Sequence, residues 1–144
     1  MKKYVVLLIA GIIVLVDQLT KLLALNNLGS VPIIKNVLHL TLVKNTGAVF
    51  GMMHGQNVIL IWISLIVVGF ILFYLEDLCE SKAGMVMTAL VIGGAVGNLI
   101  DRIRVGYVID FIDFRIWPVF NVADSAIMVG VIGLVILSFY ENKK

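Results

Sequence analysis

The chain has 144 residues, of which 61% are hydrophobic and only 14% are charged. Soluble domains are nearer half apolar and a quarter charged, so this composition excludes an ordinary soluble domain and indicates a membrane protein. The formal charge of +2, without an Arg/Lys stripe, excludes nucleic acid as an expected partner. The single cysteine, Cys79, excludes an intrachain disulfide and a multi-cysteine metal site.

Four apolar runs follow one another, each close to the ~20 residues that cross ~30 Å of hydrocarbon as a helix. We expect membrane-spanning helices at about 4–25, 58–75, 84–102 and 121–140. The chain, 1–144, is therefore predicted to form one membrane-embedded domain, an all-α bundle of four transmembrane helices. The lysines before the first run also fit a signal peptide, but the run is too long and no small-residue cleavage site follows it.

The segment between the first two predicted helices, about 28–56, is not apolar enough to be a span. Leucines alternate with other residues from Leu38 to Leu42, which is the period of a strand, and Asn45-Thr46-Gly47 supplies turn chemistry. We predict a small β element at the membrane surface here. The loop at about 104–120 also looks extended, since 108–114 is rich in strand-forming residues.

Four spans would place both termini on the same side of the membrane. Lys2 and Lys3 precede the first predicted helix, and Lys143 and Lys144 follow the last one. Lysines favour the cytoplasmic side, but basic residues also fall on the opposite side, so the N-terminal pair decides, because the first helix usually dominates. Both termini are therefore predicted to be cytoplasmic and the β element extracytoplasmic.

Polar residues gather near one end of the predicted spans. They are Asp17, Gln18, Lys21, Asn45, Asn98, Asp101, Arg102, Asp110, Asn121 and Asp124. Alternating passage of the helices puts all of them at the extracytoplasmic face. Charged groups at membrane depth are costly, so they pair with one another or face water. The sequence thus predicts one polar cluster at the outer boundary of the membrane.

Several members of this cluster have a structural interpretation. Asp17 and Lys21 are four residues apart, as in a helical ion pair. Asn98, Asp101 and Arg102 share a helix face, which favours a carboxylate–guanidinium pair. A structural role is the better interpretation for Asp101, whereas structure and substrate contact are evenly matched for Arg102.

The aspartates nearer the C-terminus are more ambiguous. Asn121 followed by Asp124 resembles a helix N-cap with an acid in the first turn, so for Asp124 capping and function both remain open. Asp110 and Asp113 lie in an apolar, extended stretch, where a solvated role explains them poorly. Only one of these two is expected to point into the bundle.

The chemistry that remains is that of carboxylates. His39 and His54 have no clustered partners, Cys79 is expected at the other face, and Ser125 has no histidine nearby, which disfavours metal sites and Ser/His or Cys/His hydrolases. Two aspartates held close together share a proton, so that one can activate water while the other acts as an acid. No metal or cofactor is expected.

Intramembrane Asp, Arg and Lys also mark ion pathways, so a proton- or ion-conducting transporter subunit is the alternative. A pathway needs polar residues through the full depth of the spans. The runs at 58–75 and 121–140 are almost wholly apolar below their outer ends, which opposes this alternative. An anchor for a partner protein would leave the polar cluster unexplained.

Five short sequence blocks contain most of the polar cluster, and their order along the chain resembles that of a known family. They are Asp17-Gln18-Leu19-Thr20-Lys21, Asn45-Thr46-Gly47-Ala48-Val49-Phe50-Gly51, Gly93-Gly94-Ala95-Val96-Gly97-Asn98-Leu99-Ile100-Asp101-Arg102, Val108-Ile109-Asp110-Phe111 and Phe120-Asn121-Val122-Ala123-Asp124-Ser125. With these blocks, the chain resembles lipoprotein signal peptidase (signal peptidase II), a membrane aspartic peptidase family of bacteria. One block is weak evidence, but the five cover nearly the whole chain.

The resemblance implies an intramembrane aspartic endopeptidase that cleaves diacylglyceryl-modified prolipoproteins just before the lipidated cysteine. It implies that Asp110 and Asp124 are catalytic. Substrate-binding residues implied in the same way are Asn45, Asn98, Arg102 and Asn121, and stabilising residues are Asp17 and Lys21.

The resemblance further implies a β-cradle over the outer surface of the bacterial cytoplasmic membrane, contact with membrane lipid and inhibition by globomycin-type cyclic peptides. We also expect a monomer. The segment between Asp110 and Asp124 is shorter than in many members of the family, so the resemblance gives no firm expectation for a lid over the site.

Overall fold

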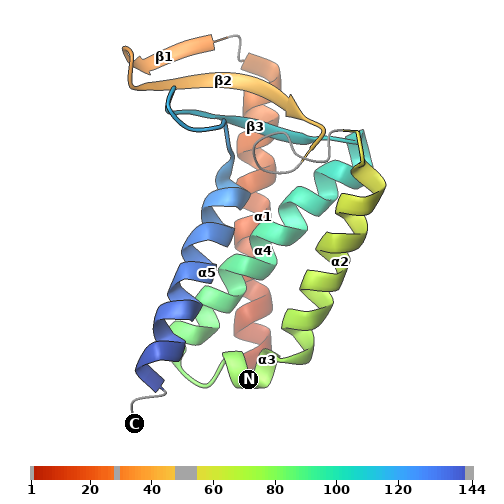
Figure 1. Cartoon of the computed structure of the whole chain (residues 1–144), viewed down its shortest axis with the longest axis vertical. Helices are drawn as coiled ribbons and strands as arrows, with labels where there is room; N and C mark the ends of the chain where they lie inside the picture. Colours follow the sequence, from red (N-terminus) through yellow and green to blue (C-terminus); the bar gives the residue numbers. More distant parts are fainter. Residues whose placement is uncertain (1, 28–29, 48–54, 142–144) are drawn as a thin grey trace.

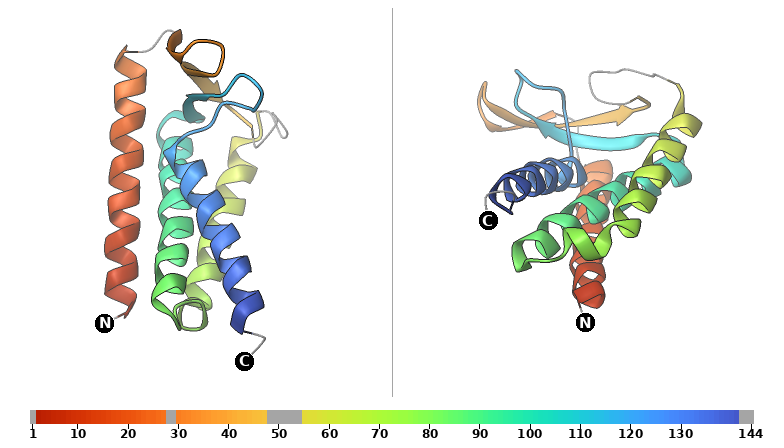
Figure 2. Two further views of the ribbon diagram at one scale, coloured as in Figure 1. Left: turned by 90° about the vertical axis from the view of Figure 1, so that its left-hand side faces the viewer. Right: turned by 60° about the horizontal axis from the view of Figure 1, so that its bottom comes forward.

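The computed structural model describes residues 2–27, 30–47 and 55–141. Its elements are α1 (Lys2–Asn27), β1 (Ser30–Ile34), β2 (Leu38–Asn45), α2 (Asn57–Phe73), α3 (Leu75–Leu78), α4 (Lys82–Val105), β3 (Val108–Asp113) and α5 (Val122–Glu141). The long helices stand side by side, and the sheet covers one end of them (Figure 1). The start of α1 and the end of α5 lie at the opposite end (Figures 1 and 2).

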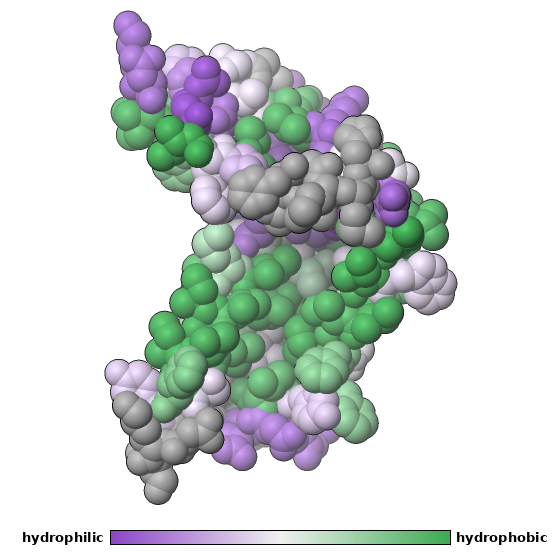
Figure 3. Space-filling view, viewed as in Figure 1, coloured by the Kyte–Doolittle hydropathy of each residue, from purple (hydrophilic) through white to green (hydrophobic). Residues whose placement is uncertain are grey.

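Three of the described helices, α1, α4 and α5, are long and apolar enough to cross a membrane. The fourth, α2, is apolar along its 17 residues but shorter. The helices lie where the apolar runs predicted them. Figure 3 shows apolar side chains over the helices and hydrophilic side chains at both ends of the molecule.

Helix α4 is the centre of the bundle. In the most apolar stretch of α4, 61% of the residues are buried, compared with 22% in α1 and 17% in α5. The reason is that α4 packs against all the other long helices. Glycines on α4 make this packing close. A Cβ atom at Gly93 would lie 2.8 Å from Ile13 Cβ of α1, and one at Gly94 would overlap the Ala123 carbonyl oxygen of α5. Gly93 and Gly94 therefore allow the backbones of α1 and α5 to lie close to that of α4.

The described residues form a sheet of three antiparallel strands in the order β1-β2-β3. β3 comes from the loop between α4 and α5, where the sequence predicted an extended stretch at 108–114. The prediction did not join that stretch to the β element between the first two long helices. Gly106 ends α4 in the left-handed conformation, with φ of 81°, and the chain turns there into β3. Val43 of β2 pairs with Asp110 of β3, so the strands bring residues far apart in the chain next to each other.

Two glycine substitutions test the packing of α4. Gly94→Ala should lower the free energy of unfolding by about 1–3 kcal/mol, since the new methyl would meet the Ala123 carbonyl and lie 2.7 Å from Ile127 Cγ1. Gly69→Ala is the matched control on α2, where no atom of the described residues lies within 4 Å of the added methyl group. It should raise the free energy of unfolding by roughly 0.5–1 kcal/mol. Unfolding of both variants in detergent is the measurement. Equal shifts for the two would contradict the packing role of Gly94.

Candidate active site

A buried ammonium group lies on α1 near the sheet end of the bundle. Lys21 Nζ forms ion pairs with Asp17 Oδ2 at 2.9 Å and Asp101 Oδ2 at 2.8 Å, and it donates to Asn98 Oδ1 at 2.9 Å. These three acceptors match the three N–H bonds of an ammonium group. The Lys21 side chain is only 1% exposed, and so buried a charge is stable only when it is paired in this way. The ion pair predicted from the spacing of Asp17 and Lys21 is confirmed.

The two carboxylates around Lys21 also bind main-chain N–H groups of other elements. Asp17 Oδ1 accepts from Ala123 N at 3.0 Å, in the first turn of α5. Asp101 Oδ2 accepts from Ile109 N at 3.2 Å, in β3. Through these contacts the Lys21 ammonium connects α1, α4, α5 and β3.

The cation partner of Asp101 differs from the prediction. The ion pairs of the described residues join Asp101 to Lys21, and none joins it to Arg102. Successive residues of a helix point about 100° apart, so Arg102 is directed away from the face on which Asp101 meets α1. Gln18 belongs to the predicted polar cluster, but the sequence assigned it no role. Its Nε2 donates to Asp101 Oδ1 at 3.0 Å and to the Gly97 carbonyl at 3.2 Å, so it helps to join α1 to α4.

Asn121 caps α5, as its position predicted. Its Oδ1 accepts from Asp124 N at 2.8 Å, while Asp124 Oδ2 accepts from Asn121 N at 3.2 Å. This reciprocal pair is a capping box. The other oxygen, Asp124 Oδ1, accepts from Asn98 Nδ2 at 2.8 Å. Asp124 is thus held at both oxygens in the first turn of α5, where the helix dipole favours a negative charge.

Asp110 lies on β3 and is only 1% exposed. Its Oδ1 accepts from Asn121 Nδ2 at 2.7 Å and its Oδ2 from Asn45 Nδ2 at 2.9 Å. Burial is the main cause that raises the pKa of Asp110 to about 7, and the nearby charge of Asp124 adds to it. The hydrogen bonds from the two amides act in the opposite direction. Asp110 therefore retains a proton over a wider pH range than an ordinary aspartate.

Asp113 on the same strand has different partners. It accepts from the Thr41 hydroxyl at 2.9 Å and from Arg115 N at 2.8 Å, and it forms an ion pair with the Arg115 side chain. The hydrogen bond from the Arg115 main-chain N–H is the main cause that lowers the pKa of Asp113. Asp110 is the aspartate of β3 that contacts the polar network of the helices, whereas Asp113 contacts β2 and the following turn.

The structure brings the two candidate catalytic aspartates together through Asn121. This asparagine binds Asp110 with its side-chain amide and Asp124 with its main-chain N–H, and it is fully buried. Its Nδ2 also approaches Asn98 Oδ1 at 3.1 Å. Arg102 lies at the edge of this network, half-buried, with Nη2 3.4 Å from the Gly47 carbonyl. Residues 48–51 of the second sequence block lie outside the described residues.

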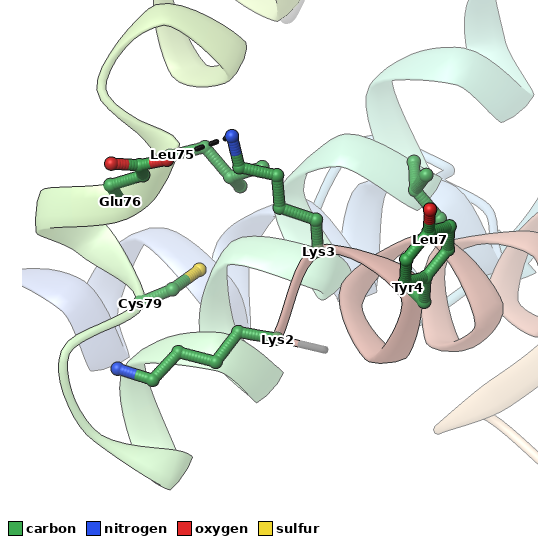
Figure 4. Close-up of a pocket in the computed structure, with 7 residues that line it drawn as sticks. All are labelled: Lys2, Lys3, Tyr4, Leu7, Leu75, Glu76 and Cys79. Carbon is green, nitrogen blue, oxygen red and sulfur yellow. Dashed lines mark ion pairs between the residues drawn. The ribbon is translucent and has the colours of Figure 1, made fainter.

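Hollows on the surface do not by themselves indicate this site. One of about 590 Å³ opens at the end where the chain begins, lined by Lys2, Lys3, Tyr4, Leu7, Leu75, Glu76 and Cys79 (Figure 4). It contains the exposed ion pair of Lys3 and Glu76, at 2.8 Å. A much smaller hollow, of about 30 Å³, adjoins Lys21 and Asp101. Converging polar groups are therefore a better guide to the site than volume.

Comparison with known proteins assigns the chain to a family. Residues 9–140 match the family described as Signal peptidase (SPase) II. This chain belongs to the signal peptidase II family. The lipoprotein signal peptidase of Halothermothrix orenii is 47% identical over 144 residues, which cover 98% of this chain and 97% of that protein. The lipoprotein signal peptidase of Caldanaerobacter subterraneus subsp. tengcongensis is 47% identical over 141 residues, which cover 94% and 97% of the two proteins.

A solved structure has the same fold as this chain. It is a bacterial membrane enzyme, determined by the in meso method at 2.3 Å resolution, with 32% sequence identity and a TM-score of 0.87. The match covers 96% of this chain and 89% of that one. The protein is therefore a multi-pass bacterial membrane peptidase, and the alternative of a transporter subunit is not supported.

The raised pKa of Asp110 predicts how the stability of this protein depends on pH. A carboxyl whose pKa rises on folding, here from 3.8 to about 7, binds more protons in the folded state, so stability falls as pH rises through that window. Asp110→Asn cannot ionise. The melting temperature of the variant minus that of the wild type should therefore become more positive between pH 5 and pH 8 in detergent.

Asp113→Asn is the control for this measurement. Folding lowers the pKa of Asp113, so its contribution to stability is complete above about pH 4 and is lost only in more acidic solution. The melting temperature of Asp113→Asn minus that of the wild type should stay nearly constant from pH 5 to pH 8. A constant difference for Asp110→Asn as well would show that Asp110 is ionised throughout this range.

Proposed function

We propose that this chain removes the signal peptide from prolipoproteins whose cysteine carries diacylglycerol, cutting just before that cysteine, with Asp110 and Asp124 as the catalytic pair. The observation that carries the proposal is that Asn121 binds both carboxylates at the sheet end of the bundle. The substrate class follows from the relatives, which are named lipoprotein signal peptidases.

The surroundings of the two aspartates favour different roles. Asp124 lies in the first turn of α5, where the helix dipole favours a negative charge, so we assign it as the base. Asp110, with its pKa near 7, is the acid. Asp124 takes a proton from water as the water oxygen attacks the scissile carbonyl carbon. Asp110 gives its proton to the carbonyl oxygen, which yields a neutral tetrahedral diol.

The second half of the reaction returns the protons. The ionised Asp110 takes a proton from one hydroxyl of the diol while the protonated Asp124 gives its proton to the leaving nitrogen. The C–N bond then breaks, which releases the signal peptide with a carboxyl end and the lipidated cysteine with a free amine. Both carboxyls return to their starting states, so the cycle balances without another reactant.

The substrate-binding residues divide into two groups. Asn45 and Arg102 are half-buried at the edge of the network, and we propose that they contact the peptide backbone beside the scissile bond. Asn98 and Asn121 are buried, and their amide groups already bind the aspartates. A direct contact of either with substrate would require the exchange of one of these bonds. Positioning of the pair is therefore their first role.

We also propose the placement in the membrane. α1, α2, α4 and α5 cross it as four spans, the termini are cytoplasmic, and the sheet is a cradle on the extracytoplasmic surface beside the site. Lys2 and Lys3 at the start of α1 support this orientation, because the sheet lies at the other end of the helices (Figure 1). Substrate then reaches the site laterally from the bilayer. We further propose that the enzyme is a monomer in contact with lipid and is inhibited by globomycin-type cyclic peptides.

The catalytic assignment predicts the behaviour of two amide variants. Asp110→Asn and Asp124→Asn should each lower the rate of cleavage at least about 100-fold, because an amide neither takes a proton from water nor returns one. Cleavage of a diacylglyceryl-modified prolipoprotein in detergent, followed by gel mobility, is the measurement. Asp113→Asn, the same change three residues along β3, should retain most activity. Turnover by a folded Asp110→Asn or Asp124→Asn would remove that residue from the catalytic role.

The reaction class predicts the response to reagents. EDTA, thiol alkylators and serine-directed reagents should leave cleavage intact, whereas globomycin should abolish it. Cys79→Ser should be nearly silent, because Cys79 is buried beside the hollow at the end of the bundle opposite the sheet. Loss of activity on chelation, restored by added metal, would assign the enzyme to another class of peptidase.

A further inference from the structure

The third acceptor of Lys21 gives it a connection to the catalytic pair. Asn98 Oδ1 accepts from Lys21 Nζ at 2.9 Å, and Asn98 Nδ2 donates to Asp124 Oδ1 at 2.8 Å. We infer that Lys21 is a positioning residue for the catalytic pair, since it fixes the Asn98 amide in the orientation that donates to Asp124. This inference rests on the proposed catalytic role of Asp124.

The amide of Asn98 has donors on one side and a carboxylate on the other. Its Oδ1 receives Lys21 Nζ and Asn121 Nδ2, and its Nδ2 faces Asp124. A flipped amide would place its NH₂ group against an ammonium and another amide donor, and its oxygen against a carboxylate oxygen. All three contacts would become repulsive. Of the two donors to Asn98 Oδ1, the Lys21 ammonium opposes this flip more strongly, because it carries a full positive charge.

Lys21 is itself held in place from two sides. Asp17 and Asp101 bind its ammonium from α1 and α4, and both carboxylates are buried. Gly97 permits the close approach of α1 to α4 here, since a Cβ atom at that position would lie 2.6 Å from Asp17 Oδ2. The ammonium therefore cannot move away from Asn98 without losing both ion pairs. A fixed donor of this kind is what the orientation of Asn98 requires.

The test separates positioning from general stability. Lys21→Met alone would leave two buried carboxylates without a cation, so the test variant is Lys21→Met with Asp101→Asn. The group formed by Lys21, Asp17 and Asp101 then carries the same charge of −1 as in the wild type. The baseline is Asp101→Asn alone, in which this charge is 0, so that the comparison isolates the loss of Lys21. We expect kcat to be about 10–100-fold below this baseline, with KM changed less than about threefold. A kcat within threefold of the baseline would overturn the inference.

A cycle with Asn98 identifies the route of the effect. If Lys21 acts through Asn98, then adding Lys21→Met to an Asn98→Ala, Asp101→Asn background should lower kcat less than about threefold. An effect of the same size in both backgrounds would overturn the inference, because a purely structural loss is independent of Asn98. Asn98→Asp supplies a second test with Lys21 intact. It keeps the acceptor for Lys21 but removes the donor to Asp124, so retained kcat would also overturn the inference.

Failure of this inference can be told apart from failure of the proposed function. Should Asp110→Asn and Asp124→Asn still cleave, the catalytic assignment is wrong, whatever Lys21 does. When both are inactive and the Lys21→Met variant matches its baseline, only the positioning role of Lys21 is wrong. Melting temperatures of all variants, measured under the assay conditions, show that each kcat refers to folded enzyme.

Discussion

The buried ammonium of Lys21 is the interaction on which the arrangement of the polar end depends. It neutralises part of the charge of Asp17 and Asp101, and each of these carboxylates binds a main-chain N–H of another element. Without the ammonium, two anions would remain buried, which costs several kcal/mol. The position of α5 relative to α4, and of β3 relative to both, therefore depends on one side chain of α1.

Within the described residues, the side chains that donate hydrogen bonds to the two candidate catalytic carboxylates are neutral amides. Asn45, Asn98 and Asn121 supply the side-chain donors, and a main-chain N–H of the capping box supplies another. An amide donor stabilises a carboxylate without neutralising it, so the repulsion between Asp110 and Asp124 persists. Burial, together with that repulsion, holds the pKa of Asp110 near 7. Lys21 contacts Asn98, which in turn contacts Asp124, so the ammonium orients the Asn98 amide without pairing directly with the carboxylate. Asp110 and Asp124 can therefore still exchange protons with substrate and water.

The helices pack by a different principle from the helices of a soluble bundle. Large apolar side chains on the outer faces of α1, α2 and α5 are exposed, as suits contact with lipid. Apolar burial therefore gives little preference for one helix arrangement over another. Close packing at Gly93 and Gly94 and the polar network around Lys21 supply that preference instead. The network that positions the site thus also selects the fold of the sheet end.

The sequence by itself determined the features that depend on short separations along the chain. Apolar runs predicted the helices, the four-residue spacing predicted the pair of Asp17 and Lys21, and the three-residue spacing predicted the cap of α5, because helix geometry fixes all of these. Only the tertiary structure decided which residues meet across the bundle. Lys21 rather than the adjacent Arg102 pairs with Asp101, and β3 joins β2, since these contacts depend on how close α4 lies to α1 and where the chain leaves α4. No pattern within a single segment contains that information.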